Sequence, residues 1–444
     1  MREVLVNPLI DNAKFNRFFK GVLAICMLTT ICDGFDVNLF SMVIPSLMKD
    51  WHLLPVATGT LASWGMFGMI FGSLFFGPFA DAIGKKRAIL IGTTGYVILT
   101  TACGFATNVS NFAVLRFFAG FCLAGVYPLA VAFTSEYSPK QIRSRLTVWT
   151  TSGMAIGPII AGLIGIAIIV PLGWRWMFYV TGVMILLLIA QAFLPESVAF
   201  LKKTGQRERI ANTLEKIEPT FKATAEDDYK LAATATGKGN LGNLFTGGYA
   251  RNTIIFWCMM VCSYIFIYGV LMWLPKLMTL KGFSIKFGLF FTLVWNLGFI
   301  LGIPLFGYLQ DKFGGKRTLQ VGWVVAAILV SCIGFQNDFY VLAVLIFLTG
   351  ACQHGVSGVA GSYIAQSYPI HFRATGTTWG YGCGRIGGTL GPIIGGYLVA
   401  MKLPVGYNLM CFGSVIFVAA IIVSFSKDFS RQKTAVDQPQ TVRA

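Results

Sequence analysis

The sequence is poor in charge, and poorest in acidic residues. Only 12% of its 444 residues are charged, with 18 Asp and Glu against 35 Lys and Arg, while 55% are hydrophobic. A typical soluble domain carries about 25% charged residues. Together with a mean hydropathy of +0.70, this shortage excludes a soluble globular protein and predicts an all-α chain that crosses a membrane several times.

The residues of catalytic and metal sites are also scarce. The chain has 3 His, none at metal-ligand spacing, and its 10 Cys are scattered without a CxxC pair. An enzyme would need a nucleophile with its base, or a metal cluster. A membrane sensor would need an added soluble domain, for which the tails and the connector are too short. We therefore expect no enzyme activity, no metal and no cofactor.

Apolar segments recur along the chain, each near the ~20 residues that a bilayer requires. They lie at 19–47, 56–80, 87–108, 111–135, 147–170, 174–194, 252–274, 286–309, 317–336, 339–366, 376–401 and 406–426. The polar segment between the sixth and the seventh is predicted to be a solvated connector with one short helix. We therefore expect a six-helix bundle over 1–195, a connector over 196–250, and a second six-helix bundle with a tail over 251–444.

The basic residues are distributed unevenly between the two sides of these twelve predicted helices. Of the 35 Lys and Arg, 27 fall on the side of the N-terminus and 6 on the other. The positive-inside rule then places both termini and the connector in the cytoplasm. The net charge of +17 therefore reflects topology in a plasma (inner) membrane, and nucleic acid is not an expected partner.

The two halves of the chain repeat each other. A run of glycines and charged residues recurs at a constant offset, for example at Gly77 and Gly307, which are 230 residues apart. The matched members are Gly68, Gly72, Gly77, Asp81, Gly84, Lys86 and Arg87 in the first half, and Gly298, Gly302, Gly307, Asp311, Gly314, Lys316 and Arg317 in the second. This repeat predicts two pseudo-symmetric bundles with a site between them near the membrane midplane.

Two carboxylates lie inside the first predicted helix. Asp33 and Asp36 are three residues apart and share a helical face, which also carries Phe40. A carboxylate at the centre of a bilayer helix costs roughly 2.5–3.5 kcal/mol. We interpret the pair as protonatable groups on a polar pathway, the alternative being a salt-bridged pair that only fixes helix packing.

These motifs resemble the major facilitator superfamily. The stretch from Gly77 to Arg87 resembles its signature between helices two and three, and Gly307 to Arg317 repeats it. More narrowly, the run from Asp33 to Asp36 followed by eight residues and Pro45 resembles the first-helix signature of the aromatic acid:proton symporters. Arg385 lies where that family has an arginine in helix eleven. The resemblance implies uptake of an aromatic carboxylate with protons, without choosing between benzoate, hydroxybenzoates, nicotinate and a related hydroxyaromatic or alicyclic acid.

Two arginines lie inside predicted helices. Arg385 is near mid-membrane depth, where its planar fork suits a substrate carboxylate. The alternative is a permanent ion pair with a buried acid, although the second half has no acid inside a helix: Asp311 and Asp338 are both at loops. Arg116 is expected near the level of Asp36, where pairing would keep one Asp ionised. The alternative is that Arg116 binds backbone carbonyls and holds helices together.

Aromatic and amide residues at central depth suit a small aromatic ring. Those expected to shape the substrate pocket, beside Phe40 and Arg385, are Trp64, Tyr127, Tyr264, Tyr268, Trp295, Asn296, Gln353, His354 and Tyr381. Membrane helices are rich in buried Trp and Tyr, so a packing role is the alternative for each, and a satisfied interior histidine is the alternative for His354.

Charged residues at the cytoplasmic helix ends resemble the gate of the superfamily. They are Asp81, Arg87, Glu136 and Arg143, with Asp311 and Arg317 in the repeat. Such contacts would form in one conformation and break in the other, the alternative being a solvated topogenic loop. The sequence therefore predicts a monomeric, proton-coupled importer of a small aromatic carboxylate working by alternating access. Its main rival is a proton-driven efflux antiporter for drugs or organic ions, against which Arg385 argues.

Overall fold

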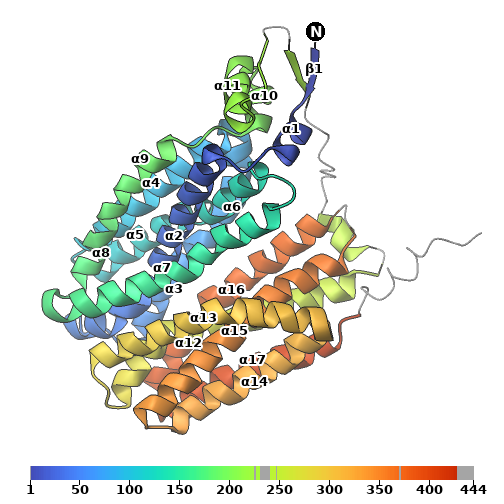
Figure 1. Ribbon diagram of the computed structural model, residues 1–444. Coiled ribbons are helices and arrows are strands. Elements are labelled where there is room, and N and C mark those ends of the chain that lie inside the picture. Colours follow the sequence, from blue (N-terminus) through green and yellow to red (C-terminus); the bar gives the residue numbers. More distant parts are fainter. Residues whose placement is uncertain (1, 225–226, 231–240, 247, 370–371, 428–444) are drawn as a thin grey trace, which may run out of the picture. The chain divides into compact units, whose positions relative to one another are not determined.

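A computed structural model describes the protein at residues 2–224, 227–230, 241–246, 248–369 and 372–427. Nearly all of this described part is helical (Figure 1). Each of the twelve predicted spans coincides with a long helix or with two helices that follow directly on one another. The expectation of an all-α membrane protein is confirmed, apart from one pair of short strands.

The first six spans begin with α2 (Arg17–Asp50), α3 (Pro55–Ile83) and α4 (Lys85–Cys103). The fourth is α5 (Val109–Leu123) followed by α6 (Val126–Glu136), and the fifth is α7 (Arg143–Leu172). The sixth consists of α8 (Arg175–Thr181), the 3₁₀ turn η1 (Gly182–Ile185) and α9 (Leu186–Ala192). The second six are α12 (Ala250–Leu280), α13 (Ile285–Phe313), α14 (Gly315–Phe335), α15 (Phe339–Ser367), α16 (Arg373–Ala400) and α17 (Val405–Ser424). Among the described residues, 10 of these spans are apolar enough to cross a bilayer by composition alone. The other two, α4 and α16, are matched by the repeat.

The chain divides into two compact units, one of residues 1–52 and 64–234 and the other of residues 53–63 and 235–444. In the first unit α2 packs along α7, and in the second α12 packs along α16. The predicted domain boundaries at 195 and 250 stay a prediction.

The two units start and stop their helices at equivalent places. The N-cap of α5 is Asn108, whose side chain accepts from Asn111 N at 2.8 Å, and the N-cap of α15 is Asp338, whose side chain accepts from Val341 N at 2.9 Å. Gly84 and Gly314 separate the second and third helices of each unit with φ of +98° and +85°, which favours glycine at both sites. The 230-residue offset therefore holds in the structure as well as in the sequence.

Helix contacts repeat with the same offset. A Cβ added to Gly68 would lie 2.0 Å from the carbonyl oxygen of Phe117, and one added to Gly298 would lie 2.2 Å from that of Phe347. The second and fourth spans of each unit therefore touch through backbone, which only small residues allow.

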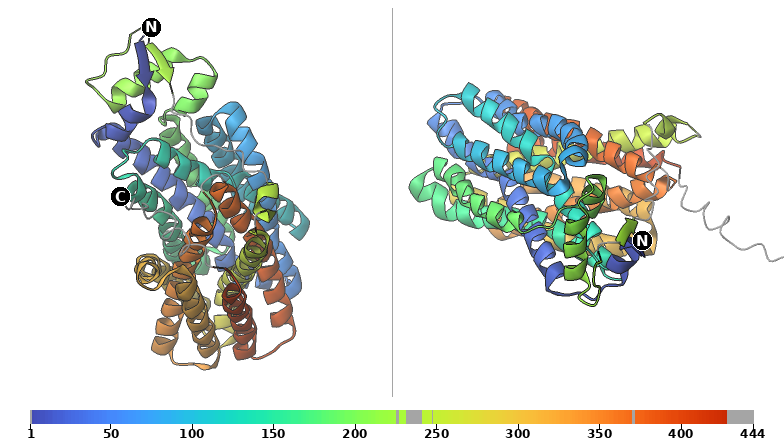
Figure 2. Two further views of the ribbon diagram at one scale, coloured as in Figure 1. Left: turned by 90° about the vertical axis from the view of Figure 1, so that its right-hand side faces the viewer. Right: turned by 90° about the horizontal axis from the view of Figure 1, so that it is seen from above.

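The connector is not the solvated segment that the sequence predicts. It contains α10 (Val198–Lys203), α11 (Arg207–Ile217), strand β2 (Asp227–Lys230) and the 3₁₀ turn η2 (Leu241–Phe245). Strand β1 (Arg2–Leu5) pairs with β2 in parallel, and α1 (Val6–Asn12) follows it, so the N-terminal segment and the connector lie together (Figures 1 and 2).

An apolar core explains this correction. Ile210, Leu214 and Ile217 lie on one face of α11 and are buried with Val6 and Ile10 of α1. Many charged residues share the segment with them, so its average composition resembles a solvated loop. The helical period of the three apolar residues was the signal that a composition-based interpretation missed.

Candidate functional site

The two intramembrane carboxylates are buried inside the first unit. Asp33 and Asp36 on α2 are 2% and 1% exposed. Arg116 on α5, 7% exposed, points its Nη1 at Asp36 Oδ2 at 3.4 Å. The predicted pairing of Arg116 with Asp36 is confirmed, and the roles of these residues in proton coupling stay a prediction.

The surroundings of Arg116 fit a guanidinium. Gly65 on α3 lies next to it, and a Cβ there would be 3.4 Å from Arg116 Nη2. The guanidinium carbon lies 5.8 Å from the ring centroid of Phe40, within range of a cation–π contact. Phe40 is 1% exposed and packs against Phe112. The structure therefore places the Phe40 ring next to the Arg116 side of the ion pair. The role of Phe40 in substrate binding stays a prediction.

The second unit fills the equivalent place with apolar side chains. By the 230-residue offset, Asp36 corresponds to Phe266, Arg116 to Ile346 and Gly65 to Trp295. All three counterparts are fully buried, and the rings of Phe266 and Trp295 are 6.4 Å apart. The charged pair therefore belongs to one unit only.

Arg385 is half-buried on α16, 12 residues after the first residue of that helix, Arg373. Gly384 and Gly388 flank it, and two tyrosines of α12 pack over them. A Cβ at Gly384 would lie 3.1 Å from the ring of Tyr264, and one at Gly388 would lie 3.1 Å from that of Tyr268. The structure therefore brings Arg385 and the two predicted tyrosines into one region of the second unit.

Three of the residues predicted for the pocket make contacts between helices of this unit. Trp295 Nε1 donates to His354 Nε2 at 3.2 Å, and the His354 ring stacks on Phe299 with centroids 3.9 Å apart. Gln353 Nε2 donates to Ser263 Oγ at 3.1 Å. His354 Nε2 accepts a hydrogen bond in this contact, and the part of His354 in substrate binding stays a prediction.

The remaining predicted pocket residues are Asn296, Trp64, Tyr127 and Tyr381. Asn296 is buried and donates to Thr292 O at 2.8 Å within its own helix. Trp64, 39% exposed, makes an edge contact with Phe67, while Tyr127 is half-buried. Tyr381 is 36% exposed. Their part in substrate binding stays a prediction.

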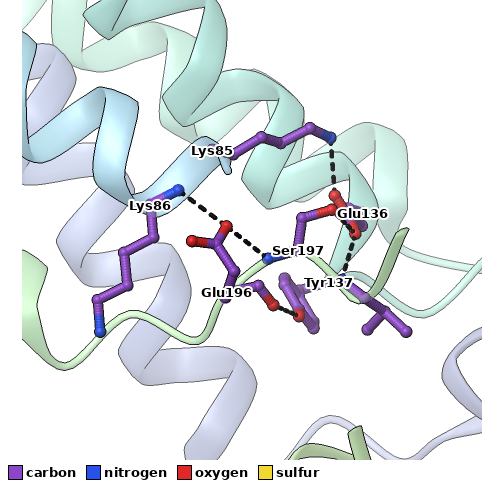
Figure 3. Close-up of polar contacts among 7 residues, drawn as sticks. Lys85, Lys86, Glu136, Tyr137, Glu196 and Ser197 are labelled. Atoms are coloured by element: carbon purple, nitrogen blue, oxygen red, sulfur yellow. Dashed lines mark hydrogen bonds and ion pairs between the residues drawn. The ribbon is translucent and has the colours of Figure 1, made fainter. Parts of the chain in front are cut away.

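The predicted gate cluster is divided between two sets of contacts. Glu136 accepts from Lys85 Nζ at 2.7 Å, and its other carboxylate oxygen accepts from Ser197 Oγ at 2.7 Å (Figure 3). Glu196 accepts from the backbone N of Lys86 at 3.1 Å. The partner of Arg143 is instead Asp11 of α1, which sequence reasoning missed.

Glu196 and Ser197 were also missed. They follow the sixth span directly, and they anchor the beginning of the connector to the ends of α4 and α6. The Glu196 carboxylate lies against Gly84, where a Cβ would be 2.5 Å from Oε2, and the φ of +98° at Gly84 favours glycine at this position. The Glu196 carbonyl accepts from Tyr137 at 2.5 Å, and burial next to Glu136 and Glu196 raises the pKa of Tyr137 above its usual value.

The other motif residues, Asp81, Arg87, Asp311 and Arg317, are all exposed on their own units. Lys203 donates to the backbone oxygen of Asp81 at 3.1 Å. Gating by these residues stays a prediction.

This arrangement can be compared with known proteins. The family model described as Major Facilitator Superfamily matches residues 26–301 and 287–443. The chain belongs to the major facilitator superfamily. A D-xylose–proton symporter of known structure matches 93% of this chain and 98% of its own with a TM-score of 0.72 and 16% identity, which shows the shared fold.

Curated members of the superfamily are closer in sequence. The benzoate transport protein of Acinetobacter baylyi is 34% identical over 96% of this chain and 92% of its own length. The gallate transporter of Pseudomonas putida is 29% identical over 94% of each. The resemblance to the superfamily and to its aromatic-acid transporters is confirmed. Since these relatives are transporters, the expectation that this multi-pass membrane protein is not an enzyme is confirmed as well.

Proposed function

We propose that the protein imports a small aromatic carboxylate together with protons across the plasma membrane by alternating access. Both termini and the connector lie in the cytoplasm in this proposal, as the charge distribution indicates. The substrate class rests on the names of the relatives, which include transporters of benzoate, gallate and 4-hydroxybenzoate. A benzoate-like anion is the simplest member of this class.

The buried Asp36–Arg116 pair is the observation that supports proton coupling. A buried ion pair stabilises a fold little compared with apolar packing, and the second unit packs the same place with Phe266 and Ile346. The presence of a charged pair in the first unit therefore indicates a functional role for Asp36 and Arg116 and not only a packing role. Arg116 stabilises the Asp36 carboxylate, and Asp33 lies on the same face one turn away.

Arg385 and the tyrosines beside it suit the substrate. A guanidinium binds a carboxylate with two parallel hydrogen bonds, and an aromatic ring packs favourably on tyrosine. Tyr264, Tyr268 and Arg385 lie together on α12 and α16. In the proposed cycle the acid binds Arg385 and a proton binds to the Asp33 and Asp36 pair. The protein then changes from its outward-open to its inward-open conformation.

The electrical balance sets the stoichiometry. Moving one net positive charge inward yields about 2.3 kcal/mol per 100 mV. One proton per monocarboxylate would be electroneutral, so assistance from the membrane potential requires more than one proton per anion.

Transport by purified protein in liposomes tests the proposal. We expect radiolabelled benzoate to accumulate under an inward proton gradient and a protonophore to abolish that accumulation. Accumulation that survives the protonophore would refute the coupling. Outward benzoate movement driven by inward protons would instead support the efflux antiporter.

A further inference from the structure

We propose that the coupled proton leaves Asp33 and Asp36 through a hydrated track inside the first unit, lined by Tyr96, Thr93, Thr29 and Gln191, which lies on the α4 and α9 side of α2. This inference rests on the proposed proton coupling. It assigns a part in transport to residues outside the predicted substrate and proton-coupling sites.

Two polar stripes define the track. On α2, Thr29, Asp33 and Asp36 follow the helical spacing and are at most 2% exposed. On α4, Thr93, Tyr96 and Thr100 follow the same kind of spacing and are fully buried. Most faces inside a membrane bundle are apolar, so two such stripes in one bundle require an explanation.

Gln191 of α9 joins the two stripes. Its Nε2 donates to Thr29 Oγ1 at 3.0 Å and to Thr93 Oγ1 at 3.1 Å. The carboxylates lie on the α2 stripe that carries Thr29, and Asp33 is one helical turn from Thr29 on the same face. A polar connection therefore runs from the carboxylates to Gln191.

Several polar atoms along this connection have no hydrogen-bond partner within the described part of the chain. They are Asp36 Oδ1, Tyr96 Oη, Thr100 Oγ1 and Gln191 Oε1, all buried. An unsatisfied buried polar group destabilises the fold, and such groups commonly bind ordered water. Four of them on one connection favour internal water between the helices.

The position of Gln191 at the end of α9 indicates that the track leads towards the connector. Gln191 lies in the last turn of α9, and Glu196 at the start of the connector follows soon after it. The proton would pass from a protonated Asp carboxyl to a water, which would hand a different proton onward to the connector side, leaving the carboxylate beside Arg116. Gln191 acts as a positioning residue, since its amide holds the two threonines and its Oε1 is available to a water.

Paired transport assays on liposomes with purified protein test this track, with benzoate as the probe. Gradient-driven uptake requires proton release, whereas counterflow of internal against external benzoate proceeds with the carrier still protonated. We expect Gln191→Leu, Thr93→Val and Tyr96→Phe to reduce gradient-driven uptake by about tenfold, which corresponds to about 1.4 kcal/mol on the barrier to proton release, and to leave counterflow unchanged.

Thr349→Val is the matched control. Thr349 on α15 is as buried as Thr93, but its hydroxyl donates at 2.7 Å to Leu345 O within its own helix. This variant should keep both activities. A high-resolution map should also show a water bonded to Tyr96 Oη and Asp36 Oδ1.

The outcomes separate the two proposals. Absence of benzoate-driven proton entry in the unmodified protein refutes proton coupling itself. Proton entry in the unmodified protein together with normal gradient-driven uptake by all three variants refutes the track alone. Equal losses in uptake and counterflow for all three variants would also overturn the track, because the residues would then only maintain packing. A high-resolution map without a water at Tyr96 Oη would overturn it as well.

Discussion

Single charged residues inside the membrane behave differently in the two units. Asp36 and Arg116 pair with each other within the first unit, whereas Arg385 is half-buried on a helix whose glycines bring two tyrosines close. A guanidinium in such a place binds a planar carboxylate well. Substitution of Arg385 is therefore the most direct test of the substrate proposal.

Arg385→Ala should weaken benzoate binding at least about tenfold, because losing one partner of a desolvated charge pair commonly costs roughly 2–5 kcal/mol. Arg385→Lys should restore binding only in part, since lysine keeps the charge but lacks the planar fork. Calorimetric affinities of each purified variant for benzoate provide the measurement.

Benzamide is the control for that charge contact. It keeps the ring and removes the carboxylate, so it should bind the unmodified protein poorly and lose little with Arg385→Ala. Equal weakening of acid and amide in a folded variant would show that the arginine is structural.

In the proposed function, Asp33 and Asp36 of α2 couple proton movement to benzoate transport. Asp33→Asn and Asp36→Asn should each abolish proton-driven accumulation of benzoate, while exchange of benzoate survives in at least one of them, because an amide cannot take up and release the proton. Asp50→Asn is the control: Asp50 also pairs with an arginine, at 2.9 Å, but is exposed at the end of α2. If both intramembrane variants still accumulate benzoate and still respond to a protonophore, the coupling site lies elsewhere.

At the scale of the helices, backbone contact between α3 and α5 sets the packing of the first unit. A Cβ at Gly72 would lie 2.1 Å from Phe121 O, whereas one at Gly77 of the same helix meets nothing within 4 Å. Gly72→Ala should therefore lower stability by roughly 1–3 kcal/mol through overpacking, and Gly77→Ala should not. Thermal unfolding of the two variants in one detergent compares them, and equal melting temperatures would contradict this account of the contact.

The helices also show what local sequence determines. Apolar segments of spanning length predicted all twelve spans, because hydropathy is a property of neighbouring residues. The break of the fourth span near Gly125 was not predicted. Neither was the bond from Asn16 Nδ2 to Ile217 O, since it joins residues 201 positions apart and no local pattern encodes such a contact.

For the molecule as a whole, the internal repeat was the most informative feature of the sequence. It predicted the paired helices, and the expected depths of Arg116 and Asp36 in their helices predicted the pairing of these two residues. It did not predict Asp11 as the partner of Arg143, because α1 has no counterpart in the repeat. The track through Gln191 was missed for another reason: single hydroxyls and amides are common in membrane helices and form a pattern only once the helices are packed.

The repeated motif also predicts how the whole molecule changes state. Asp81 and Asp311 end equivalent helices and are both exposed on their own units, so neither is needed to stabilise the unit that carries it. A carboxylate that gains a partner in only one of two global states shifts the balance between them without touching the substrate. Asp81→Asn should therefore slow benzoate uptake much more than it weakens benzoate binding.

Uptake rates in liposomes and calorimetric affinity, measured on the same preparation, separate these two effects. Glu208→Gln on α11, which removes an exposed carboxylate outside the motif, should alter neither. A change in binding as large as the change in rate would place Asp81 near the substrate, and normal uptake with normal accumulation would remove it from the gate. A slow variant with intact affinity is the result that a state-dependent contact requires, because only the barrier or the balance between the two states has then changed.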